Sequence, residues 1–226
     1  MKNKISSIIP VYNEGQRIGG VLKILCNHPI IDELIVVNDG STDNSLEIIK
    51  KFKSVKVINY IQNKGKSYAV MRGLNAAKNN TVMLVDSDLD GLNRKNIYDL
   101  ANPIIKNLAD VSISLRKNSL VIYKVMGIDF VSGERVFNKK IFGDIKNLKK
   151  ISGFGLESFM NERIIKKNLR IKIVRWDNVI SPRKSVKFGF FSGVIGDTKM
   201  VFQIIRTIGL FGIVRQIVKM KKLIVK

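Results

Sequence analysis

The chain has 226 residues, and its 45% hydrophobic content is enough to bury a sizeable core, which argues against a disordered protein and against two full domains. Its 40 lysine and arginine residues outnumber 18 acidic ones, so the net charge is +22 and we expect an anionic partner: a phosphorylated substrate, an anionic lipid or a nucleic acid. Cys26 is the only cysteine, which excludes an intramolecular disulfide and a cysteine-based metal site and fits a reducing compartment.

The first part of the chain alternates short β-branched runs with stretches of helical periodicity, which is typical of a mainly parallel sheet in a three-layer α/β fold. The elements that this pattern predicts are, in chain order, a strand at 5–9, a helix at 15–26, a strand at 33–37, a helix at 46–52, a strand at 55–60, a helix at 67–78 and a strand at 81–85. Pro10 is expected to end the first strand, and Ser41-Thr42-Asp43 to cap the second helix.

The pattern is less regular in the second half. It predicts strands at 110–115 and 170–176, with helical segments flanking Phe142 and Glu157, and its periodicity is weak across 119–134. Neither a repeat nor a low-complexity linker marks a domain boundary.

Polar clusters follow three of the predicted strands, at the point where each strand ends. They are Tyr12-Asn13-Glu14, Asn38-Asp39-Gly40 and Asp86-Ser87-Asp88. Ligands of parallel α/β sheets bind beyond the carboxyl ends of the strands. We therefore expect these three loops to converge on one edge of the sheet and to form a single site.

The segment DSDLDGL (86–92) carries two carboxylates one residue apart, after an apolar strand. Mg²⁺ and Mn²⁺ bind one or two carboxylates together with substrate phosphates, so this spacing indicates a site for a metal-bound diphosphate. The alternative, a solvated acidic turn, is disfavoured by the position of the segment level with the other two polar loops. Asp39 beside Gly40 suits hydrogen bonding to a base or ribose, but NDGSTD equally suits a turn followed by a helix cap.

Four segments resemble the motifs of family 2 glycosyltransferases in their order and spacing. They are IPVYNE (9–14), NDGSTDNS (38–45), NKGKSYAVMRGL (63–74) and DSDLDGL (86–92). The resemblance implies the GT-A fold, a Rossmann-like nucleotide-sugar domain. Ser87 stands where this family usually has alanine, and Asn38 where a second aspartate is common; neither departure removes Asp39, Asp86 or Asp88.

The resemblance also implies roles for individual residues on the donor side. Asp88 would be catalytic as a metal ligand together with Asp86, and the residues that would bind the donor nucleotide are Pro10, Tyr12, Glu14, Asp39, Lys66, Arg72, Asp86 and Ser87. Among these, Pro10, Tyr12 and Glu14 would frame the nucleoside, and Lys66 and Arg72 would approach the diphosphate. For Lys66 and Arg72, solvated helix charges are an equal alternative.

The acceptor side resembles the family less closely. Ser132-Gly133-Glu134-Arg135 is similar to the element that lines the acceptor pocket, and GFGLES (153–158) to the segment that bears an acidic residue beside the reacting centre. Glu157 is thus the candidate general base or acceptor-orienting residue, with a helix-start carboxylate as the alternative. Arg183 and Lys184 are candidates for binding a diphosphate or an acceptor phosphate. The only histidine, His28, is expected to have a surface or packing role, so a histidine metal ligand near the site is absent or replaced.

The chain ends in a basic, apolar segment, 199–226. Between residues 160 and 226 there are 16 basic residues against three acidic ones, and no 18-residue stretch is free of charge, so a spanning helix is not expected. An amphipathic helix at a membrane interface fits this composition. The alternative is that this helix packs on the catalytic domain or on a second subunit of a homo-oligomer. We divide the chain into a GT-A domain at 1–197, with a nucleotide-sugar half at about 1–117 and an acceptor half at about 118–197, and a helical tail at 198–226.

These features predict a glycosyltransferase that moves a sugar from a UDP- or GDP-sugar to a membrane lipid or lipid phosphate, using Mg²⁺ or Mn²⁺, by the inverting displacement that the resemblance implies. A soluble phosphorylated acceptor or a cell-envelope polysaccharide precursor is the alternative. A nucleic-acid-binding role is disfavoured, because no binding module is present and the aspartate cluster would be unexplained. The N-terminal MKNKISSIIPVYNE reaches a polar turn too early for a signal peptide, so we expect a cytoplasmic enzyme at the inner face of the membrane.

Overall fold

A computed structural model describes residues 4–143, 148, 151, 155–182, 209 and 211–225. Its centre is a seven-stranded sheet with the order β3-β2-β1-β4-β6-β5-β7. The strands are β1 (Ile5–Val11), β2 (Ile31–Asp39), β3 (Val55–Tyr60), β4 (Thr81–Leu84), β5 (Val111–Arg116), β6 (Arg135–Asn138) and β7 (Ile171–Trp176). Strand β6 runs antiparallel to both of its neighbours, and all other pairs are parallel. The predicted mainly parallel sheet is therefore confirmed.

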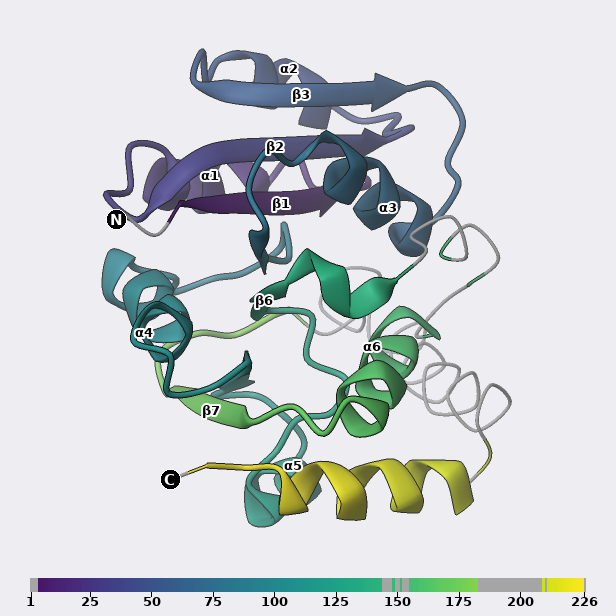
Figure 1. Cartoon of the computed structure of the whole chain (residues 1–226). Helices are drawn as coiled ribbons and strands as arrows, with labels where there is room; N and C mark the ends of the chain where they lie inside the picture. Colours follow the sequence, from purple (N-terminus) through teal and green to yellow (C-terminus); the bar gives the residue numbers. More distant parts are fainter. Residues whose placement is uncertain are drawn as a thin grey trace.

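Helices cover both faces of this sheet and give three layers. They are α1 (Ile18–Leu25), α2 (Ser45–Lys50), α3 (Lys66–Ala76), α4 (Arg94–Ile105), α5 (Val121–Met126), the 3₁₀ helix η1 (Lys139–Phe142) and α6 (Gly155–Lys166). Residues 211–222 are also helical and are called the C-terminal helix below. Figure 1 shows α3 in front of β1–β3, with α1 and α2 behind them.

Alternating side chains of the strands divide the core into two clusters. In β2, Ile35 and Val37 belong to the cluster on the α3 and α6 side, whereas Leu34 and Val36 belong to the cluster on the α1, α2 and α4 side. Successive side chains of a strand point to opposite faces, so a strand that is covered on both faces reads as a continuous apolar run. This is why short apolar runs in the sequence indicated β1 to β5 and β7.

Pro10 does not end the first strand, contrary to the prediction. β1 continues to Val11, and Pro10 pairs in register with Val37 of β2. The carbonyl of Ile8 accepts a hydrogen bond from the amide of Val85, so the backbone polar groups of Ile8 are directed towards β4. The backbone nitrogen of Pro10, two residues further along the strand, has the same direction. Because the β1–β4 pairing ends at Ile8, no partner is left there for an amide at Pro10, and proline is tolerated.

Three elements lie outside the predicted ones. Helix α4 begins at a capping box formed by Asn93 and Asn96, and its buried Ile97, Leu100 and Ala101 have the helical spacing that indicates such a helix. Helix α5 and strand β6 are short, with six and four residues.

The cap of α2 differs from the predicted one. The side chain of Asp43 accepts from the amide of Ser45, but the N-cap residue, Asn44, makes no side-chain cap bond.

The C-terminal helix packs on the domain. Gln216 is buried and donates to Ser158 and Glu162 of α6, at 3.0 Å each. After the helix, the backbone of Ile224 forms a parallel bridge with Ile171, at the start of the edge strand β7. None of the helices in the described part of the chain is long and apolar enough to cross a membrane.

His28 has the packing role expected for it. Its side chain is 3% exposed, and its Nε2 lies 3.0 Å from the carbonyl oxygen of Arg94, at the start of α4. Burial lowers the pKa of His28 below its ordinary value; the backbone contact to Arg94 opposes this shift, and the charge of Arg94 adds to it.

We predict that His28 makes the protein less stable as the pH falls. Because the pKa of His28 is lower in the folded than in the unfolded chain, the unfolded chain binds a proton first as the pH falls. The contribution of neutral His28 to folding stability is therefore complete above the ordinary histidine pKa and is lost as the pH falls towards the pKa of the folded state. Thermal unfolding followed from pH 7.5 to pH 5.5 should show a smaller decline for His28→Gln than for the native chain. Equal declines would contradict the prediction, and the absence of any other histidine makes the comparison specific.

Candidate functional site

The three polar loops converge as predicted. They border a cleft of about 390 Å³ at the carboxyl ends of β1, β2 and β4, together with the loop that precedes α3. The residues that line it are Pro10, Val11, Tyr12, Glu14, Asp39, Asn63, Gly65, Lys66, Asp86, Ser87 and Asp88. All of the predicted donor-binding residues except Arg72 are therefore brought together in one place.

The first two loops are fastened to each other by hydrogen bonds. The amide of Asn13 donates to Ser41 Oγ at 3.0 Å, and the Asn13 side chain accepts from the amide of Thr42 at 2.8 Å. The amide of Gly15 donates to Asp43 at 2.9 Å. One wall of the cleft is thus built from two connected turns, and it can hold a ligand without first becoming ordered.

Asp39 fixes the loop before α3. Its buried carboxylate accepts from the amides of Lys64 and Gly65, each at 2.8 Å, and from the side chain of Asn63 at 3.1 Å. Gly40 has φ +69°, and a Cβ there would lie 2.6 Å from the amide nitrogen of Asn63, so only glycine permits this close approach. The carboxylate therefore holds the floor of the cleft, and base recognition by Asp39 stays a prediction.

We predict that Asp39→Asn lowers both stability and affinity for the nucleotide. An asparagine side chain retains one acceptor oxygen and presents an NH₂ group to the amides of Lys64 and Gly65, which leaves a buried donor unsatisfied at a cost of about 2 kcal/mol. Urea unfolding and calorimetric titration with UDP would measure the two effects. An unchanged unfolding free energy would contradict the anchoring role. Asp32→Asn is the control, because Asp32 lies on the same strand far from the cleft.

A partly exposed cation, Lys66, links the Asp86-Ser87-Asp88 motif to α6. The Lys66 ammonium lies 2.8 Å from Asp86 Oδ1 and 3.0 Å from Glu157 Oε1. A Cβ at Gly133 would lie 2.6 Å from both oxygens of Asp86 and 2.8 Å from Lys66 Nζ, so the backbone of Gly133 closes over this ion pair. Glu157 is almost fully buried, and its second oxygen, Oε2, has no hydrogen-bond partner in the described part of the chain.

The charges of this cluster set its protonation. Burial alone would raise the pKa of Asp86, but the neighbouring charges of Lys66 and Arg116 outweigh it and hold the pKa below its ordinary value. Burial alone would lower the pKa of Lys66, yet Asp86 and Glu157 raise it above the ordinary value. Lys66 and Asp86 are therefore both charged at neutral pH.

A second group of buried charges lies behind Asp86 and was not predicted from the sequence. Arg116, at the end of β5, pairs with Glu134 at 2.8 Å and lies 3.8 Å from Asp86 and 3.9 Å from Asp129. Glu134 also accepts from Ser114. Burial raises the pKa of Glu134, and Asp86 adds to the shift, whereas Arg116 opposes it. In the sequence, Arg116 follows a predicted strand and Glu134 belongs to the segment that resembles the acceptor-pocket element, but neither pattern indicated that the two residues pair.

Asp88 contacts the segment that follows β7. Its Oδ2 accepts from Ser181 Oγ at 3.1 Å, and the backbone of Asp90 bridges to Ile180. The segment after β7 is thus attached to the loop that carries both aspartates. Across the described residues, no group of three or more histidine, cysteine, aspartate or glutamate side chains is placed to hold a metal ion.

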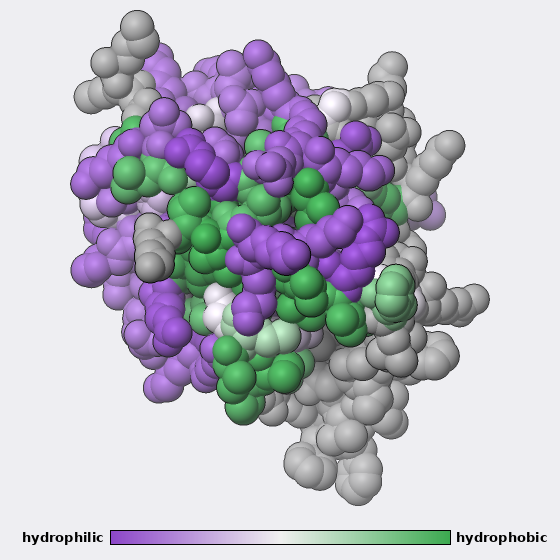
Figure 2. Space-filling view, turned by 60° about the horizontal axis from the view of Figure 1, so that its bottom comes forward, coloured by the Kyte–Doolittle hydropathy of each residue, from purple (hydrophilic) through white to green (hydrophobic). Residues whose placement is uncertain are grey.

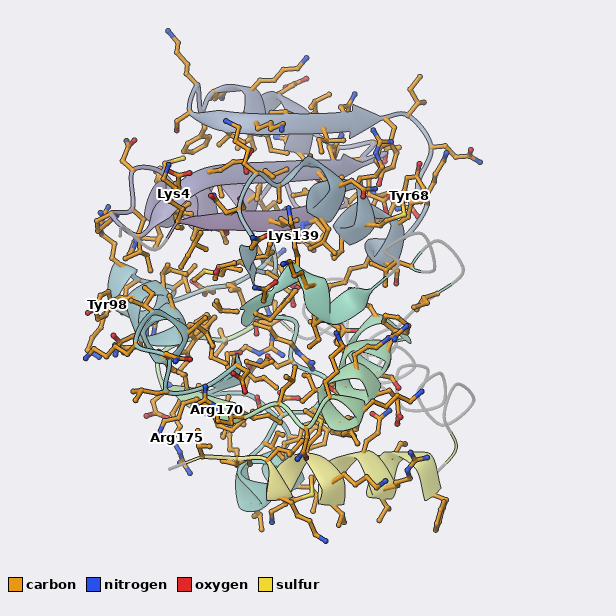
Figure 3. The ribbon with its side chains drawn as sticks, viewed as in Figure 1. Lys4, Tyr68, Tyr98, Lys139, Arg170 and Arg175 are labelled. Carbon is orange, nitrogen blue, oxygen red and sulfur yellow. The ribbon has the colours of Figure 1, made fainter. Side chains whose placement is uncertain are left out.

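Two predicted site residues lie elsewhere. Arg135 is fully buried and donates to the carbonyls of Ser132 and Phe130 and to Asn161, so its nitrogens are engaged by the protein and it does not line an acceptor pocket. Arg72 is on the α3 face towards β3, where it donates to Tyr68 (labelled in Figure 3) at 3.5 Å, and it does not border the cleft. Arg183 and Lys184 lie outside the described residues.

A smaller basic pocket of about 210 Å³ opens at the carboxyl ends of β5 and β7. Leu115, Arg116, Lys117, Lys124, Arg175 and Asp177 line it. Arg175, labelled in Figure 3, extends from β7, and Lys124 belongs to α5. Arg116 of this pocket lies 3.8 Å from Asp86, which lines the larger cleft, so the two sites are neighbours.

Comparison with known proteins agrees with these features. The model of the family described as glycosyl transferase family 2 matches residues 6–127, more than half of the chain. A glycosyltransferase, GlyA, of Streptococcus pneumoniae is 31% identical over 69% of this chain and 23% of its own length, and dodecaprenyl-phosphate galacturonate synthase of Rhizobium johnstonii is 26% identical over 51% of this chain and 36% of its own. The chain spans about a quarter of the length of the first and about a third of the second.

Among solved structures, glucosyl-3-phosphoglycerate synthase of Mycobacterium tuberculosis, in complex with Mn²⁺ and UDP-glucose, is similar with a TM-score of 0.67. The two chains are 20% identical, and the match covers 80% of this chain and 72% of the other. At this identity the likeness concerns the fold alone. The GT-A fold that the motifs implied is confirmed.

Proposed function

Because the chain belongs to glycosyl transferase family 2, we propose that it is a glycosyltransferase that moves a sugar from a UDP- or GDP-sugar to a membrane lipid or lipid-phosphate acceptor. The observation that carries this proposal is the cleft at the strand ends, where Asp39, Lys66, Asp86 and Asp88 face one space. The sugar–phosphate bond of the donor breaks as an acceptor oxygen bonds to the anomeric carbon.

The donor half of the cleft suits a nucleoside diphosphate with a bound cation. Asp86 and Asp88 are hard oxygen ligands, and two carboxylates plus phosphate oxygens match the preference of Mg²⁺ or Mn²⁺. When bound, the ion would neutralise negative charge on the departing diphosphate. Tyr12, half exposed at the rim, offers a ring face to the base, and Lys66 offers a charged donor to the phosphates.

A phosphorylated acceptor is supported by the basic pocket beside Arg116. Lys117, Lys124 and Arg175 line it with a single acidic residue, which favours an anion. A lipid phosphate is the preferred anion because exposed apolar helices lie beside the pocket. The name of the Rhizobium relative, dodecaprenyl-phosphate galacturonate synthase, also contains a lipid phosphate. A soluble phosphorylated acceptor is the second candidate, and the same pocket favours it equally. The inner face of the cell membrane is the proposed location.

Two panels test the proposal. Thermal stabilisation by nucleotide sugars, with and without Mn²⁺, should identify the donor, because a ligand that binds only the folded state raises its stability. With that donor, polyprenyl phosphate and 3-phosphoglycerate are compared as acceptors. Product formation with polyprenyl phosphate alone is expected. Product with 3-phosphoglycerate alone would support the soluble alternative, and stabilisation by no nucleotide sugar would refute the donor site.

The role of Glu157 depends on the acceptor and gives a further prediction. A phosphate oxygen is already anionic, so its attack needs no base, whereas a hydroxyl must lose its proton, for instance to Glu157 Oε2. With a lipid phosphate, we expect Glu157→Gln to lower kcat no more than about tenfold, since its remaining role is to hold Lys66. A loss of about 10²-fold or more would indicate a hydroxyl acceptor. Glu47→Gln, which changes an exposed carboxylate of α2, is the control for the substitution itself.

A further inference from the structure

Helix α5 exposes an unusual number of apolar side chains for its length. Val121, Ile122 and Val125 lie on its surface, while Tyr123 on the opposite side is buried against Phe130, with ring centroids 5.2 Å apart. A short helix of a globular protein normally turns its apolar side inwards. Here Tyr123 anchors the helix, and its remaining branched side chains face solvent.

The C-terminal helix has the same two-sided character. Gln216 and Met220 are buried against the domain, whereas Phe211, Val214 and Val218 lie on the outer side. Their spacing of three and four residues places these three on one stripe. Across both helices, the six outward apolar side chains are between 49% and 84% exposed. Packing on the domain therefore uses one side of the C-terminal helix and leaves an apolar stripe on the other.

The two helices lie on the same side of the molecule. Asn161 of α6 donates to the carbonyl of Phe130, just after α5, and also to Gln216 of the C-terminal helix. Both helices are at the bottom of Figure 1, and Figure 2, which turns this bottom forward, shows hydrophobic side chains exposed there between hydrophilic ones. We call this surface the α5–C-terminal face; it consists of Val121, Ile122, Val125, Phe211, Val214, Val218 and the basic residues around them.

The charges of the α5–C-terminal face are mainly positive. Residues 117–126 and 211–222 contain no aspartate or glutamate. Their basic residues are Lys117, Lys124, Arg215, Lys219, Lys221 and Lys222. Glu162 of α6 is an acidic neighbour, 3.7 Å from Arg215. Apolar side chains among an excess of cations are typical of helices that lie in the headgroup region of anionic membranes.

We propose that the α5–C-terminal face docks on an anionic lipid bilayer, with α5 as a second membrane-contacting element besides the C-terminal segment. The inference deepens the proposed function and rests on it for the identity of the acceptor. Lys124 belongs both to this face and to the basic pocket that contains Arg116. Docking would bring that pocket to headgroup level, where a lipid phosphate is presented. A second copy of the chain is a poorer partner, because a symmetric contact through this face would bring together two surfaces with an excess of positive charge.

Vesicle flotation of the full chain tests the proposal in the absence of donor and acceptor, so that its outcome is separate from that of the activity assays. The vesicles are phosphatidylcholine alone, or phosphatidylcholine with about one third phosphatidylglycerol. Two double variants, Val121→Ser with Val125→Ser and Val214→Ser with Val218→Ser, remove apolar surface from each helix. Ile61→Ser is the matched control, because Ile61 is also an exposed apolar side chain but lies in the loop after β3.

We expect binding to the anionic vesicles only, weakened about tenfold by each double variant and unchanged by the control. Binding should also weaken at high salt. Native affinity of the α5 double variant, or no binding of the native chain, would overturn the proposal. Light scattering provides a further test of the proposal. If the native chain is a dimer and the double variants are monomers, a second copy covers this face and the proposal is overturned. Lys124→Glu, which keeps the apolar surface, provides an independent variant, and circular dichroism verifies that each one is folded.

Discussion

Asp88→Asn is expected to lower kcat by about three orders of magnitude and to abolish the dependence of nucleotide binding on Mn²⁺. Asparagine preserves the shape of the side chain and can still accept from Ser181, so the loop should keep its conformation. What is lost is one of the two carboxylate charges beside the proposed diphosphate position. Calorimetric titration with UDP, with and without Mn²⁺, measures the binding effect separately from the assay of transfer.

Asp90→Asn provides the comparison for this variant. Asp90 lies two residues further along the same loop, is exposed, and its side chain accepts only from the adjacent amide of Gly91 among the contacts described. It should retain nearly native activity and the native response to Mn²⁺. A fully active, metal-independent Asp88→Asn enzyme would refute the assignment of Asp88 to the donor site.

The donor side of the site was predictable because its residues follow strands whose order and direction the sequence reveals. Parallel strands place their carboxyl ends at one edge, so Asp39, Asp86 and Asp88 had to meet once three strands were recognised. What the sequence did not show is that the protein already engages Asp39 and Asp86. Their partners, Lys64, Gly65 and Lys66, come from a loop and the first residue of α3, and the conformation of this loop depends on the close contact at Gly40.

The acceptor side was predicted less well because it depends on contacts between distant segments. Strand β6 inserts antiparallel between β4 and β5, and this places Glu134 beside Arg116 and turns Arg135 into the interior. A four-residue strand has too short a pattern to be recognised. For the C-terminal helix, the two alternatives of domain packing and an interfacial role are compatible, because its buried side is anchored to α6 and its outer side stays apolar and basic.

Lys66→Met is expected to have the second large effect. Lys66 is the cation between Asp86 and Glu157, and it borders the cleft where the diphosphate is proposed to bind. Methionine keeps much of the side-chain volume but removes the charge. The carboxylates of Asp86 and Glu157 then have no ammonium group between them. We expect kcat/KM to fall about 10²- to 10³-fold and the free energy of unfolding to fall by about 2 kcal/mol, less than for a fully buried pair because Lys66 is partly exposed.

The pH dependence of the stability of Lys66→Met distinguishes loss of the ion pair from loss of packing. Without Lys66 the neighbouring carboxylates repel one another, and protonation relieves the repulsion, so the loss of stability should be larger at pH 8 than at pH 5.5. Urea unfolding at the two pH values measures it. Lys64→Met is the control: Lys64 is exposed, its ammonium lies 5.1 Å from the centre of the Tyr68 ring, and its amide contact to Asp39 survives the change. If Lys66→Met lost stability equally at both pH values, packing would explain the effect, and the ion pair would not be what holds Asp86 and Glu157 together.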